Sequence, residues 1–282
     1  MSSSLFSNRQ LLVASMHQKE RAIAPILEKH LGVKCVLYDG LNTDLLGTFT
    51  GEIERKLDPV STVREKCLMA MKLSGCDLAV ASEGSFGPHP ALYFLHANEE
   101  WLMLIDQKNH LEILAREITT QTNFDAKTVF NETELLEFAQ SKGFPSHALI
   151  LRKTPTSLSP IVKGIHHSPQ LLSEFAKLNA DKSGVYVETD MRAMHNPSRM
   201  KTIEAATQKL LQMLQSNCPN CHIPGFWITE TLKGLPCAGC GHPTQSVKAH
   251  VYRCSHCQFE KTQSLIDQKP NEDPMYCDYC NP

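Results

Sequence analysis

The chain has 282 residues, 41% hydrophobic and 21% charged, and its formal net charge is −2 at pH 7. This length and composition are typical of a folded globular protein of about two domains, and the near-neutral charge excludes a general attraction to nucleic acid. No apolar run reaches the roughly 18 residues that a membrane span requires, so we expect no membrane-spanning segment.

Short apolar runs predict a series of strands along the chain. Two neighbouring runs, Trp101 to Asp106 and Leu111 to Ile118, predict a hairpin. Asp77 to Ser82 is apolar throughout its centre, as buried strands of parallel sheets are. The Gly and Pro residues that follow predict a rigid loop from Glu83 to Pro90. The other predicted strands cover Arg9 to Ser15, Val33 to Tyr38, Ala148 to Leu151 and Val185 to Glu188.

Helices are expected between these strands, several of them marked by capping residues. Asp58 before Pro59 is a typical helix start, and Asn131 with Glu134 forms a capping box. The other predicted helices run from about Ile23 to Leu31, from Ser168-Pro169 and from Asn196-Pro197. The alternation predicts an α/β domain over residues 1–214, with a mixed, mostly parallel sheet flanked by helices. Between the second strand and the next helix, residues 39–56 form a polar loop that is long enough to suggest a function.

Eight of the 11 cysteines lie in four Cys-x-x-Cys steps close to the C-terminus. Each step places two thiolates on one side of a tight turn, so four steps supply two complete four-cysteine sites, for which Zn²⁺ is the usual ion. Four thiolates leave no position for water, so both zinc ions are expected to be structural. A set of disulfides is the disfavoured alternative. The predicted ligands in this module, residues 215–282, are Cys218, Cys221, Cys237, Cys240, Cys254, Cys257, Cys277 and Cys280.

The pairing of the four steps depends on the strands between them. The gaps are 15, 13 and 19 residues long. Ser246 to Arg253 and Gln258 to Gln263 predict a hairpin around the third step, as in a zinc ribbon. We therefore favour a nested arrangement, in which the second step joins the third and the first joins the fourth. A sequential arrangement and a cross-brace stay open.

Cysteine usage and the N-terminus predict a cytoplasmic protein. The isolated Cys35, Cys67 and Cys76 lie on apolar stretches, as reduced core cysteines do. The first 20 residues contain only the short apolar run Leu11 to Ala14, which predicts a strand and not a signal peptide. In the zinc module acids outnumber bases by one, and each four-thiolate zinc site adds two negative charges, so its net charge is about −5 and nucleic acid is an unexpected partner.

Three predicted loops combine polar residues at the ends of strands. The first carries His17 and Lys19 before a helix, where anions are favoured, and the second carries Glu83 and His89. The third carries Asp190, Arg192 and Arg199. Ligands of open α/β sheets bind where parallel strands end, so we expect these loops to meet. Carboxylates can hold Mg²⁺, and the cations can hold phosphate.

Each of these residues also has a purely structural interpretation. Lys19 can be an exposed first-turn residue, and His17 and His89 can be hydrogen-bonded loop histidines. Arg192 and Arg199 can form structural ion pairs with Asp190 or Glu188. The sequence alone does not decide between these interpretations.

Several segments together resemble a bacterial family in which an α/β domain precedes a region of cysteine knuckles, and for which no activity is established. They are residues 41–55, Ser82 to Pro90, Thr189 to Ala193 with Asn196-Pro197, and the terminal Cys-Asp-Tyr-Cys-Asn-Pro. The resemblance covers essentially the whole chain. It implies the two-part organisation described above and no particular chemistry.

A second resemblance covers about the first 120 residues. Ser15 to Lys19, the helix around Val63 to Leu73, and Asp77 to Gly84 are similar in order to the pyrophosphatases that clear inosine and xanthosine triphosphates. The resemblance implies that Lys19 contacts phosphate and that Glu83 lies near Mg²⁺. His17 stands where those enzymes have Asn, and Ser82-Glu83-Gly84 replaces their acidic segment. The resemblance therefore implies nothing about which nucleotide base would be recognised.

The functional prediction is a Mg²⁺-dependent nucleotide or phosphoester hydrolase with a structural two-zinc module. Glu83, His89 and Asp190 are its catalytic candidates, and His17, Lys19, Arg192 and Arg199 its phosphate-binding candidates. It has neither a Walker loop nor a GxGxxG motif, which disfavours an ATPase or a dehydrogenase. The alternative is a non-enzymatic adaptor whose zinc module binds a protein through the aromatic residues Phe226, Trp227, Tyr252 and Tyr276.

Overall fold

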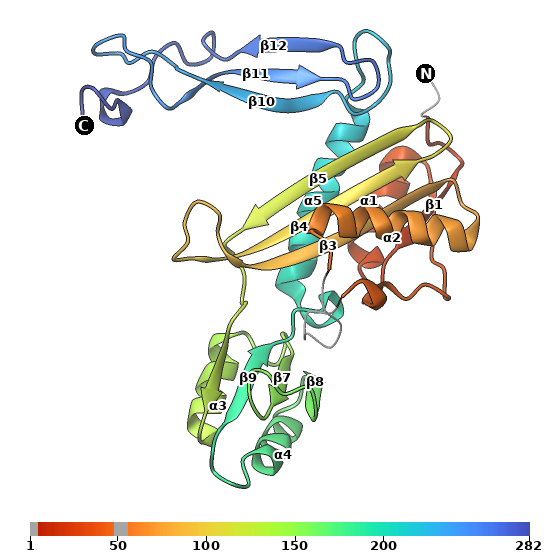
Figure 1. The fold of residues 1–282 in the computed structure, drawn as a ribbon, viewed down its shortest axis with the longest axis vertical. Helices are drawn as coiled ribbons and strands as arrows, with labels where there is room; N and C mark the ends of the chain where they lie inside the picture. Colours follow the sequence, from red (N-terminus) through yellow and green to blue (C-terminus); the bar gives the residue numbers. More distant parts are fainter. Residues whose placement is uncertain (1–4, 48–55) are drawn as a thin grey trace. The chain divides into compact units, whose positions relative to one another are not determined.

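The computed structural model describes residues 5–47 and 56–282 (Figure 1). The chain divides into two compact units, Met1–Leu211 and Gln212–Pro282. Part of the polar loop predicted over residues 39–56, including Gly51, lies outside the described residues, as does most of the resembling segment 41–55. Among the helices of the described ranges, none combines the length and the apolar character needed to cross a membrane.

The first unit contains two separate sheets. The five-stranded sheet has the order β2-β1-β3-β4-β5, and the four-stranded sheet has the order β6-β9-β7-β8. The strands of the first sheet are β1 (Gln10–Ala14), β2 (Lys34–Val36), β3 (Leu78–Pro88), β4 (His96–Asp106) and β5 (Leu111–Thr119). Those of the second are β6 (Ala126–Val129), β7 (Leu149–Arg152), β8 (Ile161–Ile165) and β9 (Val185–Thr189).

The α/β class and the mixed sheet are confirmed, but the sheets are not mostly parallel. Only β1 pairs in parallel, with β2 and with β3, among the described strands. The predicted hairpin of β4 and β5 is present, and β3 to β5 form an antiparallel meander. The second sheet is antiparallel throughout. The expectation of mostly parallel pairing is corrected, because short apolar runs do not reveal strand direction or which strands share a sheet.

Helices begin where the capping residues predict. The Asp58 carboxylate accepts from the backbone N–H groups of Val60 and Ser61 at the start of α2 (Pro59–Ser74). Asn131 and Glu134 form their reciprocal capping box at α3 (Glu132–Ser141). The other helices are α1 (Glu20–Leu31), α4 (Ser168–Leu178) and α5 (Pro197–Gln215), with short 3₁₀ turns η1 (Thr43–Leu46), η2 (Ala193–His195) and η3 (Pro274–Tyr276).

The alternation of side chains on β4 assigns its two faces. Met103 and Ile105 pack in one hydrophobic cluster with Val63 and Cys67 of α2. Glu100 points to the opposite face, because successive side chains of a strand alternate. There it meets Arg199 of α5. Helices α2 and α5 therefore cover opposite faces of this sheet.

Strand β3 is longer than predicted and passes beyond the end of its parallel neighbour. Pairing with β1 stops at Ala14↔Ala81, whereas pairing with β4 continues without a break to Pro88↔His96. Glu83 therefore lies inside a strand and not in a loop. Beyond Ala81, side chains of β3 line a cavity.

Arg199 forms a buried ion pair that joins α5 to this sheet. Its Nε donates to Glu100 Oε1 at 2.6 Å, and both side chains are fully buried. Its Nη1 donates to the carbonyl oxygen of Met191, which follows β9 in the second sheet. The guanidinium also lies over the Phe86 ring. One side chain thus connects a helix with segments of both sheets.

Gly84 of β3 is required by this ion pair. A Cβ atom at position 84 would lie 2.4 Å from Arg199 Nη2 and 2.6 Å from Glu100 Oε1. Both atoms are fixed in a buried contact, so neither can move aside at low cost.

The zinc module is a three-stranded antiparallel meander in the order β10-β11-β12. Its strands are β10 (Trp227–Lys233), β11 (Val247–Arg253) and β12 (Glu260–Ser264). The predicted hairpin of β11 and β12 is present, whereas β10 was not predicted. Every second connection of a meander returns to the same end of its sheet, a constraint that fixes the pairing of the cysteine steps.

We expect Arg199→Met to lower the free energy of unfolding of the α/β unit by about 3–5 kcal/mol, because it leaves the buried Glu100 carboxylate without its cation. Urea denaturation in a Trp227→Phe background, followed by the fluorescence of Trp101 in β4, measures this. Arg64→Met is the matched control: it removes the exposed ion pair with Glu112, and we expect a loss of less than about 1 kcal/mol. Equal losses in the two variants would contradict the role given to Arg199.

Candidate functional site

The eight predicted cysteines form two clusters of four. Cys218, Cys221, Cys254 and Cys257 make the first, and Cys237, Cys240, Cys277 and Cys280 the second. Within each cluster the ligand atoms lie within 4.8 Å of one another. None of the cysteines is in a disulfide.

The sulfur positions fit a tetrahedral zinc ion. A Zn–S distance of about 2.3 Å gives a tetrahedron whose sulfur–sulfur edge is about 3.8 Å. The Sγ atoms of Cys218 and Cys257 are 3.7 Å apart, and those of Cys237 and Cys280 are 3.8 Å apart. Backbone N–H groups of Asn220 and Gly239 donate to Cys218 and Cys237 sulfurs, as donors do around thiolate ligands. The module can therefore hold two metal ions, with zinc the ion that this ligand set favours.

The favoured nested pairing is wrong, since the first step joins the third and the second joins the fourth. This is the cross-brace, which the sequence left open. The first step precedes β10 and the third connects β11 to β12, so both lie at one end of the meander. The second step connects β10 to β11 and the fourth follows β12, at the other end. A prediction without β10 lacks one strand and one turn of the meander. It therefore places the first cysteine step at the wrong end of the sheet.

Two of the four aromatic residues proposed as docking contacts are part of the zinc core. Phe226 is buried in a cluster with Cys218 and Cys254, and its ring contacts those of Tyr252 and Phe259. Trp227 is half-buried, and Tyr276 is exposed on η3. Phe226 and Tyr252 thus pack against the first cysteine cluster, whereas Tyr276 is exposed.

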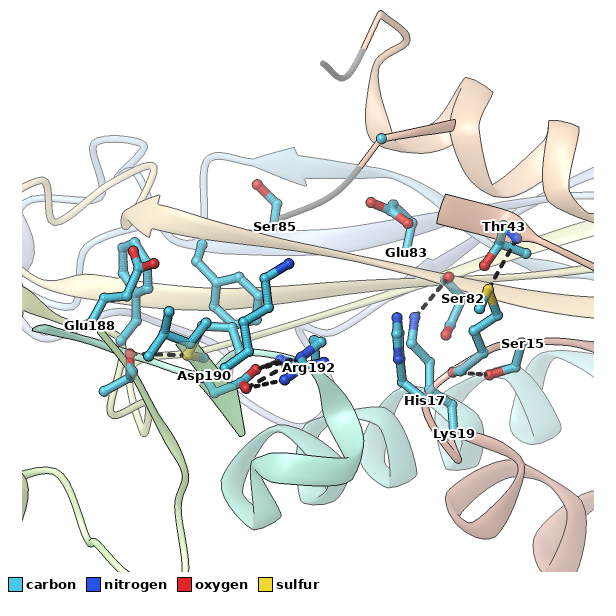
Figure 2. A pocket seen from close by; sticks show the side chains of 18 of the residues that line it. Ser15, His17, Lys19, Thr43, Ser82, Glu83, Ser85, Glu188, Asp190 and Arg192 are labelled. Carbon is cyan, nitrogen blue, oxygen red and sulfur yellow. Dashed lines mark hydrogen bonds and ion pairs between the residues drawn. The ribbon is translucent and has the colours of Figure 1, made fainter. Parts of the chain in front are cut away.

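The α/β unit contains a cavity of about 420 Å³. It is lined from β1, the β1–α1 loop, η1, α2, β3, β6, β7, β8, β9 and the segment after β9 (Figure 2). Five of the predicted site residues line it: His17, Lys19, Glu83, Asp190 and Arg192. The polar loops therefore meet, although they come from two sheets and not from one parallel sheet.

Lys19 begins α1 and is buried at the cavity. Positive φ angles at His17 and Gln18 turn the chain from β1 into the helix, and no side chain caps its N-terminus. The Lys19 ammonium donates to the carbonyl oxygen of Ser82 in β3 at 3.2 Å (Figure 2). No carboxylate lies within ion-pair distance of it in the described part of the chain.

The pKa of Lys19 is lowered to about 7, chiefly by burial and also by the positive charges of Arg199 and Lys66, against the carboxylates of Glu100 and Glu83. Close to it, the buried Ser82 hydroxyl lines the cavity and has no hydrogen-bond partner among the described residues. A cation without a counterion and an unsatisfied hydroxyl, beside a helix N-terminus, form a local site for an anion.

The two candidate carboxylates are held in different ways. Glu83 forms a buried ion pair with Lys66 of α2. Asp190 is fully buried. Its Oδ1 accepts from the Arg192 backbone N–H and Nε, and its Oδ2 accepts from Arg192 Nε and Nη2 and from the Gly164 backbone N–H. Asp190 thus positions Arg192, whose Nη1 donates no hydrogen bond within residues 5–47 and 56–282.

Two predicted site residues do not line the cavity. His89 lies in the β3–β4 connection, where its Nδ1 accepts from the backbone N–H groups of Ala91 and Leu92. Arg199 is held in the buried pair with Glu100. Both have the structural contacts that the sequence left open for them.

Other cavity residues were not found in the sequence. Lys66 has the spacing of the buried stripe of α2. A charged residue on a buried stripe was the signal that could have identified it as a site residue. Tyr186 and Glu188 alternate with Val185 and Val187 of β9, and this alternation places them together on the opposite face of the strand from the valines. Ser82 was taken only as the end of an apolar strand.

A known protein family matches the part of the chain that contains most of these site residues. A family described as "Domain of unknown function (DUF6671)" matches residues 66–282. The chain belongs to this family. The match confirms the resemblance to a family with an α/β part followed by a cysteine region. The DUF6671 match starts at Lys66, so it includes both cysteine clusters, Glu83, Asp190 and Arg192, but not the β1–α1 loop with Lys19.

No curated protein matches the chain. The resemblance of the first 120 residues to inosine and xanthosine triphosphate pyrophosphatases therefore has no support from related proteins.

We expect purified protein to contain two zinc ions, measured by elemental analysis under reducing conditions. Pairs of Cys→Ser substitutions test the cross-brace directly. Cys218→Ser with Cys254→Ser removes ligands of one centre and should leave one zinc, whereas Cys218→Ser with Cys277→Ser affects both centres and should leave none. The nested arrangement requires the opposite result, and Cys35→Ser with Cys76→Ser is the control that should keep both ions.

Proposed function

We propose that the α/β unit binds a phosphate-bearing small molecule and hydrolyses its phosphoanhydride or phosphoester bond with Mg²⁺, while the two zinc ions stabilise the C-terminal module. The observation that carries this proposal is Lys19, a buried amine at the N-terminus of α1 that has no ion-pair partner among residues 5–47 and 56–282. The Ser82 hydroxyl, which has no hydrogen-bond partner in the same ranges, lies in the same cavity.

The phosphate group is assigned to the end of the cavity that contains Lys19. There it would accept from the ammonium and from Ser82 Oγ, and the α1 N-terminus favours its charge. Arg192 lines the same cavity, and Asp190 holds its guanidinium by two nitrogens. The Nη1 donors of Arg192 can reach a second phosphate oxygen. Because Asp190 already fixes the side-chain conformation of Arg192, the entropic cost of binding is lower.

Glu83 is the carboxylate assigned to Mg²⁺. Apart from the cysteine clusters, no three Cys, His, Asp or Glu side chains converge on one point among the described residues. Mg²⁺ commonly uses one or two carboxylates together with substrate phosphate oxygens, so a single Glu beside a phosphate site fits this ion. Mg²⁺ would activate water and neutralise the phosphate charge. The ion pair with Lys66 fixes the position of the Glu83 carboxylate.

A protein-binding role of the zinc module is the second candidate. Three large side chains beside the second zinc centre are strongly exposed: Met275 at 59%, Tyr276 at 61% and Tyr279 at 69%. Exposed aromatic and Met side chains are typical of protein-binding surfaces. This role is compatible with hydrolysis in the α/β unit and becomes the main function if no hydrolysis occurs.

Glu83→Gln should lower Mg²⁺-dependent turnover of nucleoside triphosphates about 100-fold, because the amide keeps the shape of the side chain and loses the charge that binds the metal. Release of phosphate or pyrophosphate, measured across a panel of nucleotides and phosphoesters, tests this. Glu65→Gln, on the exposed face of α2, is the control and should retain full turnover. Equal turnover of Glu83→Gln and the wild type would remove Glu83 from the mechanism.

Anion binding should depend on pH through Lys19. Only the protonated amine attracts an anion, and its pKa in the free protein is about 7. Affinity is therefore fully present below pH 7 and falls as the pH rises above it, by up to about tenfold per unit until the pKa of the bound state is reached. Calorimetric titration with sulfate, which does not titrate in this range, measures the effect. Lys19→Arg keeps its charge and should flatten the profile, and an unchanged profile in this variant would exclude Lys19 as the source.

A further inference from the structure

The cavity has a second end, formed by one face of the four-stranded sheet. On β9, Val185 and Val187 pack in the hydrophobic cluster that includes residues of α3 and α4. Tyr186 and Glu188 alternate with them and line the cavity. The register pairs Glu188 with both Ala126 and Ile150, so these two residues share its face and also line the cavity.

This face combines apolar, aromatic and charged side chains. Ala126, Ile150 and Tyr186 lie on three adjacent strands, and Glu188 stands in register between Ala126 and Ile150. Two further rings line the cavity next to it, those of Phe86 and Phe124, whose centroids are 5.6 Å apart. A sheet face of this composition, open to a cavity and not covered by a helix, is suited to a flat ligand surface.

Two carboxylates stand among or beside these residues. Glu188 forms an ion pair with Arg152 on the neighbouring strand, and burial raises the pKa of Glu188. Asp125 precedes β6 and pairs with Lys142. Both carboxylates line the cavity, where they can accept hydrogen bonds from N–H groups at the edge of a ring.

The apolar surface and the anion site lie at different ends of one cavity. Figure 2 shows Lys19 at one side and Glu188 at the other, with Arg192 between them. The volume of about 420 Å³ lies in the usual range for small-molecule sites. A ligand that fills it must therefore carry a negative group at one end and a flat, weakly polar group at the other.

We propose that the ligand is a nucleotide, with its phosphates at Lys19 and its base on the surface formed by Tyr186, Ile150 and Ala126. This inference rests on the proposed function, because it uses the same phosphate site. Glu188 accepts from a ring N–H or amino group. A sugar phosphate without a base fits less well, because its hydroxyl groups would lie against Ile150 and the aromatic rings without hydrogen-bond partners.

Calorimetric titration of inorganic triphosphate, ATP and GTP, without added Mg²⁺ so that no turnover occurs, tests the inference. We expect at least one nucleoside triphosphate to bind about tenfold or more tightly than inorganic triphosphate, as expected for a base stacked on an aromatic side chain. Tyr186→Ala should remove this preference and leave the affinity for inorganic triphosphate unchanged, which also shows that the variant is folded. Tyr186→Leu retains an apolar side chain and should remove part of the preference.

Tyr93→Ala, an exposed aromatic in the β3–β4 connection, is the control and should behave as the wild type. Lys19→Met should weaken all three ligands. If inorganic triphosphate binds as tightly as both nucleotides, or if Tyr186→Ala weakens all ligands equally, the base site is wrong and the phosphate site stands. If none of the three binds to the wild type, the phosphate site fails and the base site fails with it.

Discussion

The α/β unit depends on one buried ion pair, between Arg199 of α5 and Glu100 of β4. Burying two charges costs several kcal/mol per ion, so the arrangement is stable only because each charge faces the other and Arg199 also donates to the Met191 carbonyl. These contacts join α5, the five-stranded sheet and the segment that follows β9. The same segment carries Asp190 and Arg192 into the cavity. The geometry of the proposed site therefore follows from a contact that is not itself part of it.

The electrostatics of the cavity follow from which charges are paired. Four carboxylates line it, and each has a Lys or Arg partner: Glu83, Asp125, Glu188 and Asp190. Within the described part of the chain, Lys19 has a backbone carbonyl and no carboxylate as its partner, so desolvation is the main cause of its lowered pKa. A bound phosphate would supply the missing counterion. This asymmetry, more than the number of polar residues, favours an anionic ligand.

Local features of this fold could be predicted from the sequence, whereas the arrangement of the strands could not. Caps at Asp58 and Asn131, the β4–β5 hairpin and all eight cysteine ligands follow from short-range patterns. The separation into two sheets depends on long-range pairing that apolar runs do not encode. The pairing of the cysteine steps depends on how many strands lie between them, because each strand carries the chain to the other end of the sheet. The prediction omitted β10 and therefore favoured the wrong pairing. For Arg192 and Arg199 the sequence offered the same two roles, and only burial separates them: one lines the cavity, while the other is enclosed with Glu100.

The central claim is that phosphate and Mg²⁺ meet between Lys19 and Glu83. The most direct measurement is a crystal structure with a non-hydrolysable nucleoside triphosphate and Mn²⁺, whose anomalous scattering locates the metal. The account predicts an anomalous peak at about 2.0–2.2 Å from a Glu83 oxygen and a phosphate oxygen within hydrogen-bond distance of Lys19 Nζ. Nucleotide density outside this cavity, or a metal peak with no contact to Glu83, would contradict it.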